Sequence, residues 1–329
     1  MSHRKAAIRS IHLRPLTVLQ AVLILAIPAV VIYANSLRNA FVFDDHYLVL
    51  LNPQIQDLGR YPRALQWDAQ RALDRPADRG ITHRPLRAAL LAVQFHFFGA
   101  NPIGYRTISI LIHILNGVLA FAIFKKVLGR PWPSLFAASL FVVHPIQTEA
   151  VAYVSGQRDV LFTTFYLAGF LSFVQYRHTQ QPLWLGAAAA AYIMGLLSKE
   201  MAITLPLLCA LYDLIRNLPG RGEGVATPLH RAVLESLRGM VSRDRTLYGV
   251  AGVLLVAALF YFVFVANPSH QRTLYGGGIG PTLNTSARIV VHYLKQLSVP
   301  LTLNADYSYN AFPVSPSAVD PRGLLAALI

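Results

Sequence analysis

Seven runs of apolar residues constrain the fold of this chain more than any other feature. They are Thr17–Ala34, Thr107–Phe124, Pro133–His144, Val160–Tyr176, Leu183–Leu197, Met201–Ile215 and Thr246–Ala266. A helix needs about 20 residues to cross a bilayer, and the flanks of the shorter runs extend them toward that length. Only 13% of the 329 residues are charged, against roughly 25% in a soluble domain. The sequence therefore predicts an all-α integral membrane protein with at least seven spans.

Basic residues predict the orientation of these helices. Four of them precede the first run without any acidic residue, and arginines outnumber acidic residues between positions 216 and 245. Because cytoplasmic loops are enriched in Lys and Arg, we expect both segments on the cytoplasmic side. The predicted spans are 16–34, 103–124, 133–152, 158–176, 182–198, 201–215 and 246–266. The loops 35–102 and 267–318 would then lie outside.

The sequence thus divides into a cytoplasmic N-terminus, residues 1–15, and one transmembrane domain, residues 16–329. Within the outer loops, Leu51–Leu73 and Leu86–Phe98 mix apolar residues with arginines, which is typical of surface-lying amphipathic helices. Residues 286–300 carry one polar stripe, and we expect a helix on the outer surface rather than a span. A new apolar run begins at Gly323, so we expect the chain to be truncated at its C-terminus.

Composition excludes several classes of protein. The net charge is +14, but the basic residues lie mostly between apolar runs, so we expect them to set topology and predict no nucleic-acid partner. A disulfide framework is excluded because Cys209 is the only cysteine. A first run this long without a small-residue cleavage site indicates a retained helix rather than a signal peptide.

The predicted topology places five polar clusters on the outer side. They are Asp44 with Asp45, His144 with Glu149, Arg158 with Asp159, Lys199 with Glu200, and Arg288 with Lys295. Each alone has a structural explanation, such as a solvated turn, a helix-start pair, a satisfied histidine or a helix cap. Ionisable residues at membrane depth are costly and usually mark function. Their gathering on one face therefore favours a functional site.

Five short motifs in this order carry a resemblance to a known family. They are Phe41-Val42-Phe43-Asp44-Asp45, His83-Arg84-Pro85-Leu86, His144-Pro145-Ile146-Gln147-Thr148-Glu149-Ala150-Val151, Gly156-Gln157-Arg158-Asp159, and Ser198-Lys199-Glu200 with Ile203-Thr204. Over residues 30–315 the chain resembles the membrane part of the transmembrane and tetratricopeptide-repeat O-mannosyltransferases and their bacterial relatives. That family carries a C-terminal repeat domain, which this sequence lacks.

The resemblance extends to GT-C glycosyltransferases, which are multi-pass enzymes that use polyprenyl-phosphate sugar donors. In that class an acidic residue of the first outer loop is the catalytic base, and the role falls by position on Asp44 or Asp45, with Asp44 favoured. A leaving lipid phosphate needs nearby cations, and the candidates are Arg84, Arg158, Lys199 and Arg288. Supporting or substrate-binding roles are expected for His83, His144, Glu149, Asp159, Glu200 and His292.

These expectations define a glycosyltransferase of the cell (inner) membrane with an extracytoplasmic active site. Its partners would be a polyprenyl-phosphate sugar donor, a protein or glycan acceptor and membrane lipids. We predict no cofactor: adjacent carboxylates could hold a divalent metal, but neighbouring side chains rarely both point into one site. The alternatives are a secondary transporter, which usually has a midplane site and internal repeats, and a noncatalytic membrane anchor.

Overall fold

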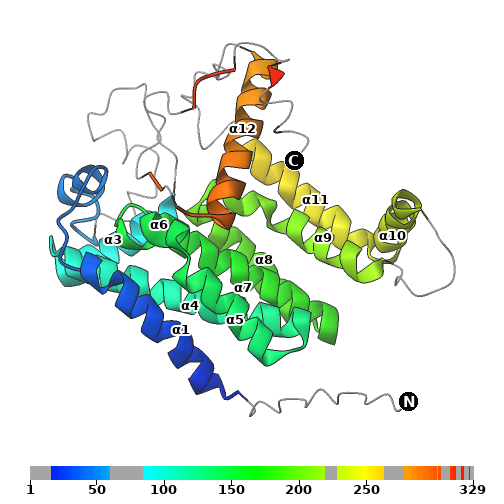
Figure 1. Ribbon diagram of the computed structural model, residues 1–329, viewed down its shortest axis with the longest axis horizontal. Helices are drawn as coiled ribbons and strands as arrows, with labels where there is room; N and C mark the ends of the chain where they lie inside the picture. Colours follow the sequence, from blue (N-terminus) through cyan, green and yellow to red (C-terminus); the bar gives the residue numbers. More distant parts are fainter. Residues whose placement is uncertain are drawn as a thin grey trace, which may run out of the picture.

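The computed structural model describes residues 16–59, 84–218, 228–262, 278–301, 303–304, 312–315, 320–321 and 326, and within these ranges every regular element is helical (Figure 1). The α-helices are α1 (Val18–Tyr33), α3 (Pro85–Phe98), α4 (Pro102–Leu128), α5 (Pro131–Val143), α6 (Thr148–Ala152), α7 (Gln157–Thr179), α8 (Pro182–Ser198), α9 (Leu205–Asn217), α10 (Leu229–Arg243), α11 (Arg245–Phe260) and α12 (Ile279–Ser298). Shorter helical turns are η1 (Ala34–Ser36), η2 (His46–Leu50), η4 (Pro145–Gln147) and η5 (Glu200–Thr204).

Proline marks the start of several helices. It occupies the first turn of α3, α4, α5 and α8, where its missing N–H would have no intrahelical partner in any case. The side chain of Asn101 caps α4 by accepting from the N–H of Ile103 at 3.0 Å. These signals explain why the predicted helix at 182–198 coincides with α8.

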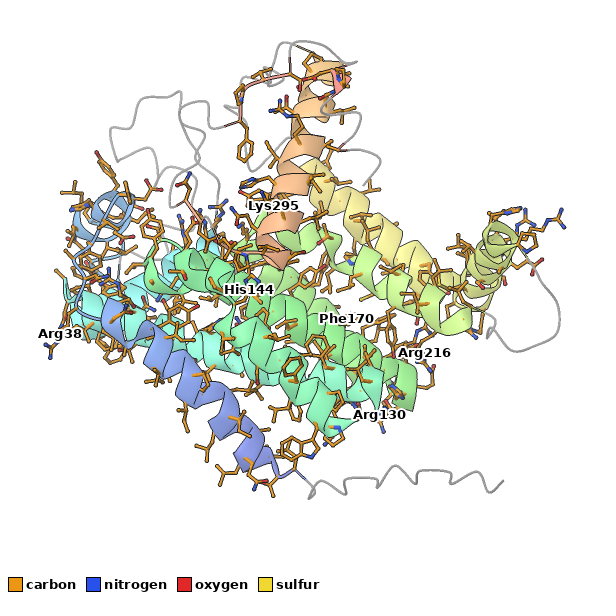
Figure 2. All side chains as sticks on the ribbon, in the orientation of Figure 1. Arg38, Arg130, His144, Phe170, Arg216 and Lys295 are labelled. Carbon is orange, nitrogen blue, oxygen red and sulfur yellow. The ribbon has the colours of Figure 1, made fainter. Side chains whose placement is uncertain are left out.

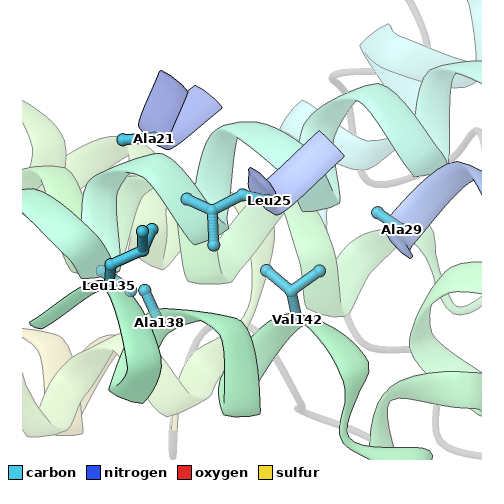
Figure 3. Packing of buried hydrophobic residues seen from close by; sticks show 7 residues of the cluster. Ala21, Leu25, Ala29, Leu135, Ala138 and Val142 are labelled. Atoms are coloured by element: carbon cyan, nitrogen blue, oxygen red, sulfur yellow. The ribbon is translucent and has the colours of Figure 1, made fainter. Parts of the chain in front are cut away.

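The bundle is built around α4, which packs against α1, α5 and α7, while α8 lies along α7. Figure 3 shows small residues of α1, including Ala21 and Ala29, facing Ala138 and Val142 of α5. At Gly117 of α4 an added Cβ would lie 2.4 Å from Val142, so glycine is needed for this close approach. The opposite face of α1 leaves large apolar side chains exposed, as expected of a helix in lipid.

Within the part of the chain that the structure describes, two helices are long and apolar enough to cross a membrane, Val18–Ser36 and Pro102–Leu128. Residues 131–152 make a third if they are counted as one span, but they bend by 47°. We expected a continuous helix over 133–152, and this was wrong because Pro145 supplies no N–H and keeps His144 extended. α8 and α11 are apolar but shorter.

The surface helices differ in part from the expectation. α3 confirms the helix predicted over Leu86–Phe98. Residues 51–59 form turns instead of the helix expected there, and 60–73 lie outside the described residues. The predicted cytoplasmic segment contains α10, which the sequence analysis did not anticipate. α12 covers the predicted stripe at 286–300 and stands out from the bundle beside α6 (Figure 1).

Candidate active site

Asp45 is a buried carboxylate with three hydrogen bonds. Its Oδ1 accepts from the backbone N–H of Ser155 at 2.8 Å and from the Ser155 hydroxyl at 2.7 Å. Its Oδ2 accepts from the N–H of Val42 at 3.2 Å. The side chain has no exposed surface. Asp45 therefore ties the segment after α1 to the segment between α6 and α7.

Asp44 differs from its neighbour because it is exposed. Its backbone N–H donates to the hydroxyl of Tyr153 at 3.0 Å. Phe43, immediately before it, has a φ of 47°, a left-handed conformation that is uncommon for a residue with a side chain. Such backbone outliers concentrate at functional sites. The turn at Phe43 thus places the two adjacent carboxylates in opposite environments.

A cavity of about 470 Å³ lies beside this turn. Its walls come from the segment after α1, Arg106 of α4, the 145–153 segment, α12 and residues 303–304, and they include Phe43, Glu149, Tyr153, Tyr293 and Asn304. Burial is the main influence on Tyr153 and raises the pKa of its phenol, so the hydroxyl stays protonated. The cavity is mainly apolar with a few polar groups, which is typical of ligand sites.

A second group of predicted residues forms ion pairs where α3, α7 and α8 meet. Arg84 directly precedes α3 and makes a two-pronged contact with Glu200, with Nη2 2.9 Å from Oε1 and Nε 3.3 Å from Oε2. Asp159 joins the ammonium of Lys199 to the guanidinium of Arg158, whose Nε lies 3.4 Å from Oδ2. Burial raises the pKa of Glu200, but its own backbone hydrogen bond and the charge of Arg84 outweigh burial, so the net pKa is low.

The two groups are joined through one short segment of chain. Ser155 binds Asp45, and four residues later Asp159 binds Lys199, so the two anchoring residues lie no more than roughly 14 Å apart. Three cations, Arg84, Arg158 and Lys199, face two carboxylates, Asp159 and Glu200, which leaves a formal excess of one positive charge. Within the described residues no cluster of His, Cys, Asp and Glu is arranged to hold a metal.

Other predicted residues have different surroundings. The Nδ1 of His144 accepts from the N–H of Ile146, so its Nε2 carries the proton and donates to the carbonyl of Leu297 at 2.9 Å. His144 therefore joins the bend after α5 to the end of α12, near Lys295 (Figure 2). Arg288 donates to the carbonyl of Pro313 at 3.1 Å, and His292 packs on Phe312. Arg288 and His292 therefore both contact residues 312–315. His83 lies outside the described residues.

Arg106 is a residue of the site that the sequence analysis missed. It lies on α4, is 1% exposed and lines the cavity. Its guanidinium donates to the carbonyls of Asn39, of Ala40 at 2.7 Å and of Ala152 at 2.9 Å, and its charge interacts with Asp45. A lone arginine inside an apolar run is costly at membrane depth, and that signal could have identified it.

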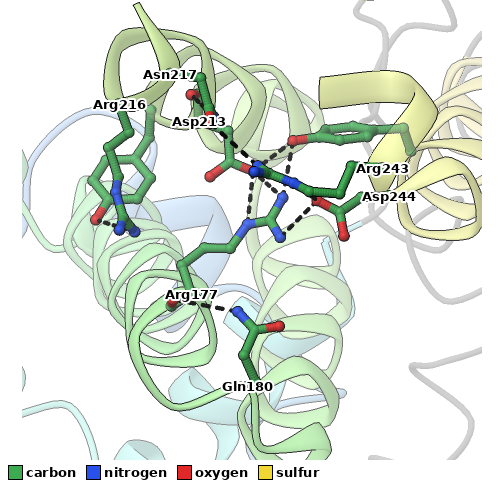
Figure 4. A network of polar contacts seen from close by, with 9 residues as sticks. Arg177, Gln180, Asp213, Arg216, Asn217, Arg243 and Asp244 are labelled. Atoms are coloured by element: carbon green, nitrogen blue, oxygen red, sulfur yellow. Dashed lines mark hydrogen bonds and ion pairs between the residues drawn. The ribbon is translucent and has the colours of Figure 1, made fainter. Parts of the chain in front are cut away.

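A different ionic cluster closes the opposite end of α7 (Figure 4). Arg177 donates from Nε to Asp213 at 2.7 Å, from Nη2 to the hydroxyl of Tyr248 at 3.1 Å, and pairs through Nη1 with Asp244 at 2.9 Å. The side chains of Arg177 and Asp213 are only 6% and 3% exposed. This cluster ties α7, α9 and α11 together.

Comparison with known proteins gives a consistent set of relatives. Residues 82–221 match the family described as dolichyl-phosphate-mannose-protein mannosyltransferase. The chain is 29% identical to the fruit-fly protein O-mannosyl-transferase Tmtc2 over 91% of its own length, and 26% identical to human TMTC4 over 92%. The chain is homologous to the TMTC protein O-mannosyl-transferases. The resemblance predicted from the motifs is thereby confirmed.

The similarity covers only part of each relative. This chain spans 31% of the length of Tmtc2 and 43% of TMTC4. The family match covers the ion pairs around Lys199 and Glu200 but not Asp44 and Asp45, which only the longer alignments can include. No solved structure matches the chain.

Proposed function

We propose that this chain is the membrane-embedded part of a glycosyltransferase. It moves mannose or a similar hexose from a polyprenyl-phosphate donor to a hydroxyl, most simply that of a protein Ser or Thr, at the extracytoplasmic face. The observation that carries the proposal is the contrast between exposed Asp44 and buried Asp45 beside a cavity, with the cations Arg84, Arg158 and Lys199 joined to them through the 155–159 segment. The names of the homologues support the class of reaction.

The proposal includes the seven-span topology. α1, α4, α7, α8, α9 and α11 each form one span, and the bent pair of α5 and α6 forms another. Arg130 and Arg216 lie at one end of the bundle and Arg38 at the other (Figure 2). With the first of these ends in the cytoplasm, Asp44 and the ion pairs of Arg84 and Lys199 are extracytoplasmic. The first helix, α4 and the rest of residues 16–329 then form one domain.

The proposed chemistry assigns the proton to Asp44. Its carboxylate takes the proton of the acceptor hydroxyl while that oxygen attacks the anomeric carbon of the sugar. The bond from the anomeric carbon to the phosphate oxygen breaks, and the lipid phosphate leaves with the electron pair. Asp45 holds the loop in place, and the cavity beside Glu149 and Tyr153 receives the acceptor and the sugar.

The leaving phosphate is stabilised by three cations that lie close together, Arg84, Arg158 and Lys199. Lys199, Arg158 and Arg84 carry one more charge than the two carboxylates that face them, so a phosphate can take over contacts now made by Asp159 and Glu200. Charge-assisted hydrogen bonds to phosphate are stronger than neutral ones. Arg288 is a weaker candidate for this role because it binds the 313–315 segment.

The test is transfer by the purified full chain in proteoliposomes. Radiolabelled polyprenyl-phosphate mannose and a Thr-containing peptide are the substrates, with GDP-mannose and a Thr→Val peptide as matched controls. We expect label in the Thr peptide from the lipid donor alone. Equal transfer from GDP-mannose would contradict the donor class, and labelling of the Val peptide would contradict the hydroxyl acceptor. No transfer from either donor would contradict the enzyme assignment.

A further inference from the structure

A groove runs along the side of the bundle between α7, α8, α9 and α11, with a volume of about 490 Å³. It begins beside the Arg177 cluster, at the end of α7 opposite the candidate active site. Its walls are largely apolar and include Phe173, Ala189, Leu205, Val250 and Leu254. Val250 and Leu254 are 53% and 39% exposed, so apolar surface remains open there.

The depth of the groove matches one leaflet of a bilayer. Its lining on α11 extends from Arg245 to Leu254, and nine residues of helix rise about 13 Å. Half of a hydrocarbon core that is about 30 Å thick measures roughly 15 Å. The groove therefore runs from a membrane surface to about the midplane.

The mouth of the groove is positively charged. Arg243 and Arg245 both line it and are exposed, Arg243 by 60%. The nearby carboxylate of Asp244 also lines the groove, but it pairs with Arg177 at 2.9 Å and with Arg243 at 3.5 Å. Counting Arg177, the described residues at this mouth are three arginines and two carboxylates, Asp213 and Asp244, which leaves one positive charge in excess.

We propose that this groove binds one anionic phospholipid. An acyl chain lies along Phe173, Leu205 and Leu254, and the phosphate contacts Arg243 and Arg245. Charge complementarity at the mouth and the one-leaflet depth both favour a lipid over a soluble anion, which would have no use for the apolar wall. The one-leaflet depth and the cytoplasmic leaflet both rest on the proposed topology, in which α11 is a span.

Native mass spectrometry of the full chain, with phosphatidylglycerol or phosphatidylcholine added, tests the proposal. We expect one phosphatidylglycerol to be retained in preference to phosphatidylcholine. Arg243→Gln/Arg245→Gln should weaken its binding by about tenfold or more, since each basic residue contributes roughly fivefold at a membrane surface. The matched control Arg231→Gln removes an exposed charge of α10 that does not line the groove.

A second pair of variants tests the groove itself without touching the arginines. Ala189→Trp fills the apolar wall and should abolish the preferred lipid, while Ala190→Trp, the exposed neighbour outside the lining, should not. Equal retention of both lipids, or binding unchanged in Arg243→Gln/Arg245→Gln and Ala189→Trp alike, would overturn the proposal. Displacement of phosphatidylglycerol by equimolar polyprenyl phosphate would also overturn it, because the groove would then belong to the donor.

Discussion

The two ends of α7 carry ionic clusters of opposite character. At its C-terminal end, Arg177 and Asp213 are 6% and 3% exposed and bind each other, Tyr248 and Asp244. At its N-terminal end, Asp159 and Lys199 are 29% and 22% exposed, and Glu200 is 37% exposed. The first cluster joins three helices through its buried core of Arg177 and Asp213, whereas the charged side chains of the second keep a larger exposed fraction. We therefore expect the buried cluster to act on stability and the more exposed cluster to act in the proposed transfer.

Removing the cation of the closed cluster should cause the largest loss of stability. Arg177→Met leaves the buried Asp213 without its cation and removes one of the two arginines paired with Asp244, which costs about 3–5 kcal/mol. Thermal unfolding in detergent measures this, with Arg216→Met as the control, since Arg216 is an exposed arginine that stacks on Tyr212. If the two variants melt alike, the closed cluster does not stabilise the bundle as described.

The open cluster should respond in the opposite way. Lys199→Met removes a cation that contacts the leaving phosphate in the proposal, so donor use should fall about ten- to a hundredfold. Stability should change by less than about 1 kcal/mol because the pair is partly exposed. Lys126→Met, an exposed lysine at the other end of the bundle, is the control for transfer assays. Unchanged donor use by Lys199→Met would place the phosphate site elsewhere.

The pH dependence of the ion pair between Arg84 and Glu200 gives a further test of the exposed cluster. A double-mutant cycle of Arg84→Gln and Glu200→Gln should give a coupling energy of about 1 kcal/mol for this partly exposed contact. Because the pKa of folded Glu200 lies below its ordinary value of 4.5, its ion pair stabilises the fold above that value. The contribution should disappear as the pH falls through the lowered pKa. A coupling that grows on acidification would contradict this.

The smallest effect is expected at Tyr153. Tyr153→Phe keeps the ring that packs on Phe43 but removes the hydroxyl that accepts from the N–H of Asp44. The loss should be about 0.5–1.5 kcal/mol of stability, measured by chemical unfolding. Tyr176→Phe, on the other end of α7, serves as the comparison. A larger loss of stability in Tyr176→Phe than in Tyr153→Phe would show that the Tyr153 hydroxyl contact does not stabilise the fold.

Local signals in the sequence predicted much of this architecture. α8 was predicted from the apolar run Leu183–Leu197, and α3 from the mixture of apolar residues and arginines over Leu86–Phe98. α10 was missed because its charged residues led us to assign the segment to a cytoplasmic loop, although its apolar residues recur at helical spacing. The 47° break at Pro145 was missed because apolar residues continue across it. Local patterns define helices, but they do not specify where a helix bends against its neighbours.

The sequence motifs indicated candidate site residues but not the contacts between them. The pattern did indicate that Asp44 and Asp45 project differently, because adjacent residues on a turn must. It could not show that Ser155, more than a hundred positions away, binds Asp45 or that Asp159 binds Lys199. Nor could it separate Arg288 from the other cations, since that depends on contacts with Pro313 and Ser315. Long-range contacts decide these roles.

The most direct test compares Asp44→Asn with Asp45→Asn, measuring both turnover and melting temperature. General-base loss lowers a rate by about 10²–10⁴, so Asp44→Asn should lose turnover while donor binding and melting stay unchanged. Asp45→Asn should melt at a lower temperature, because it disturbs the buried bonds to Ser155 and Val42. The account is contradicted if Asp44→Asn turns over normally while Asp45→Asn folds normally and is inactive.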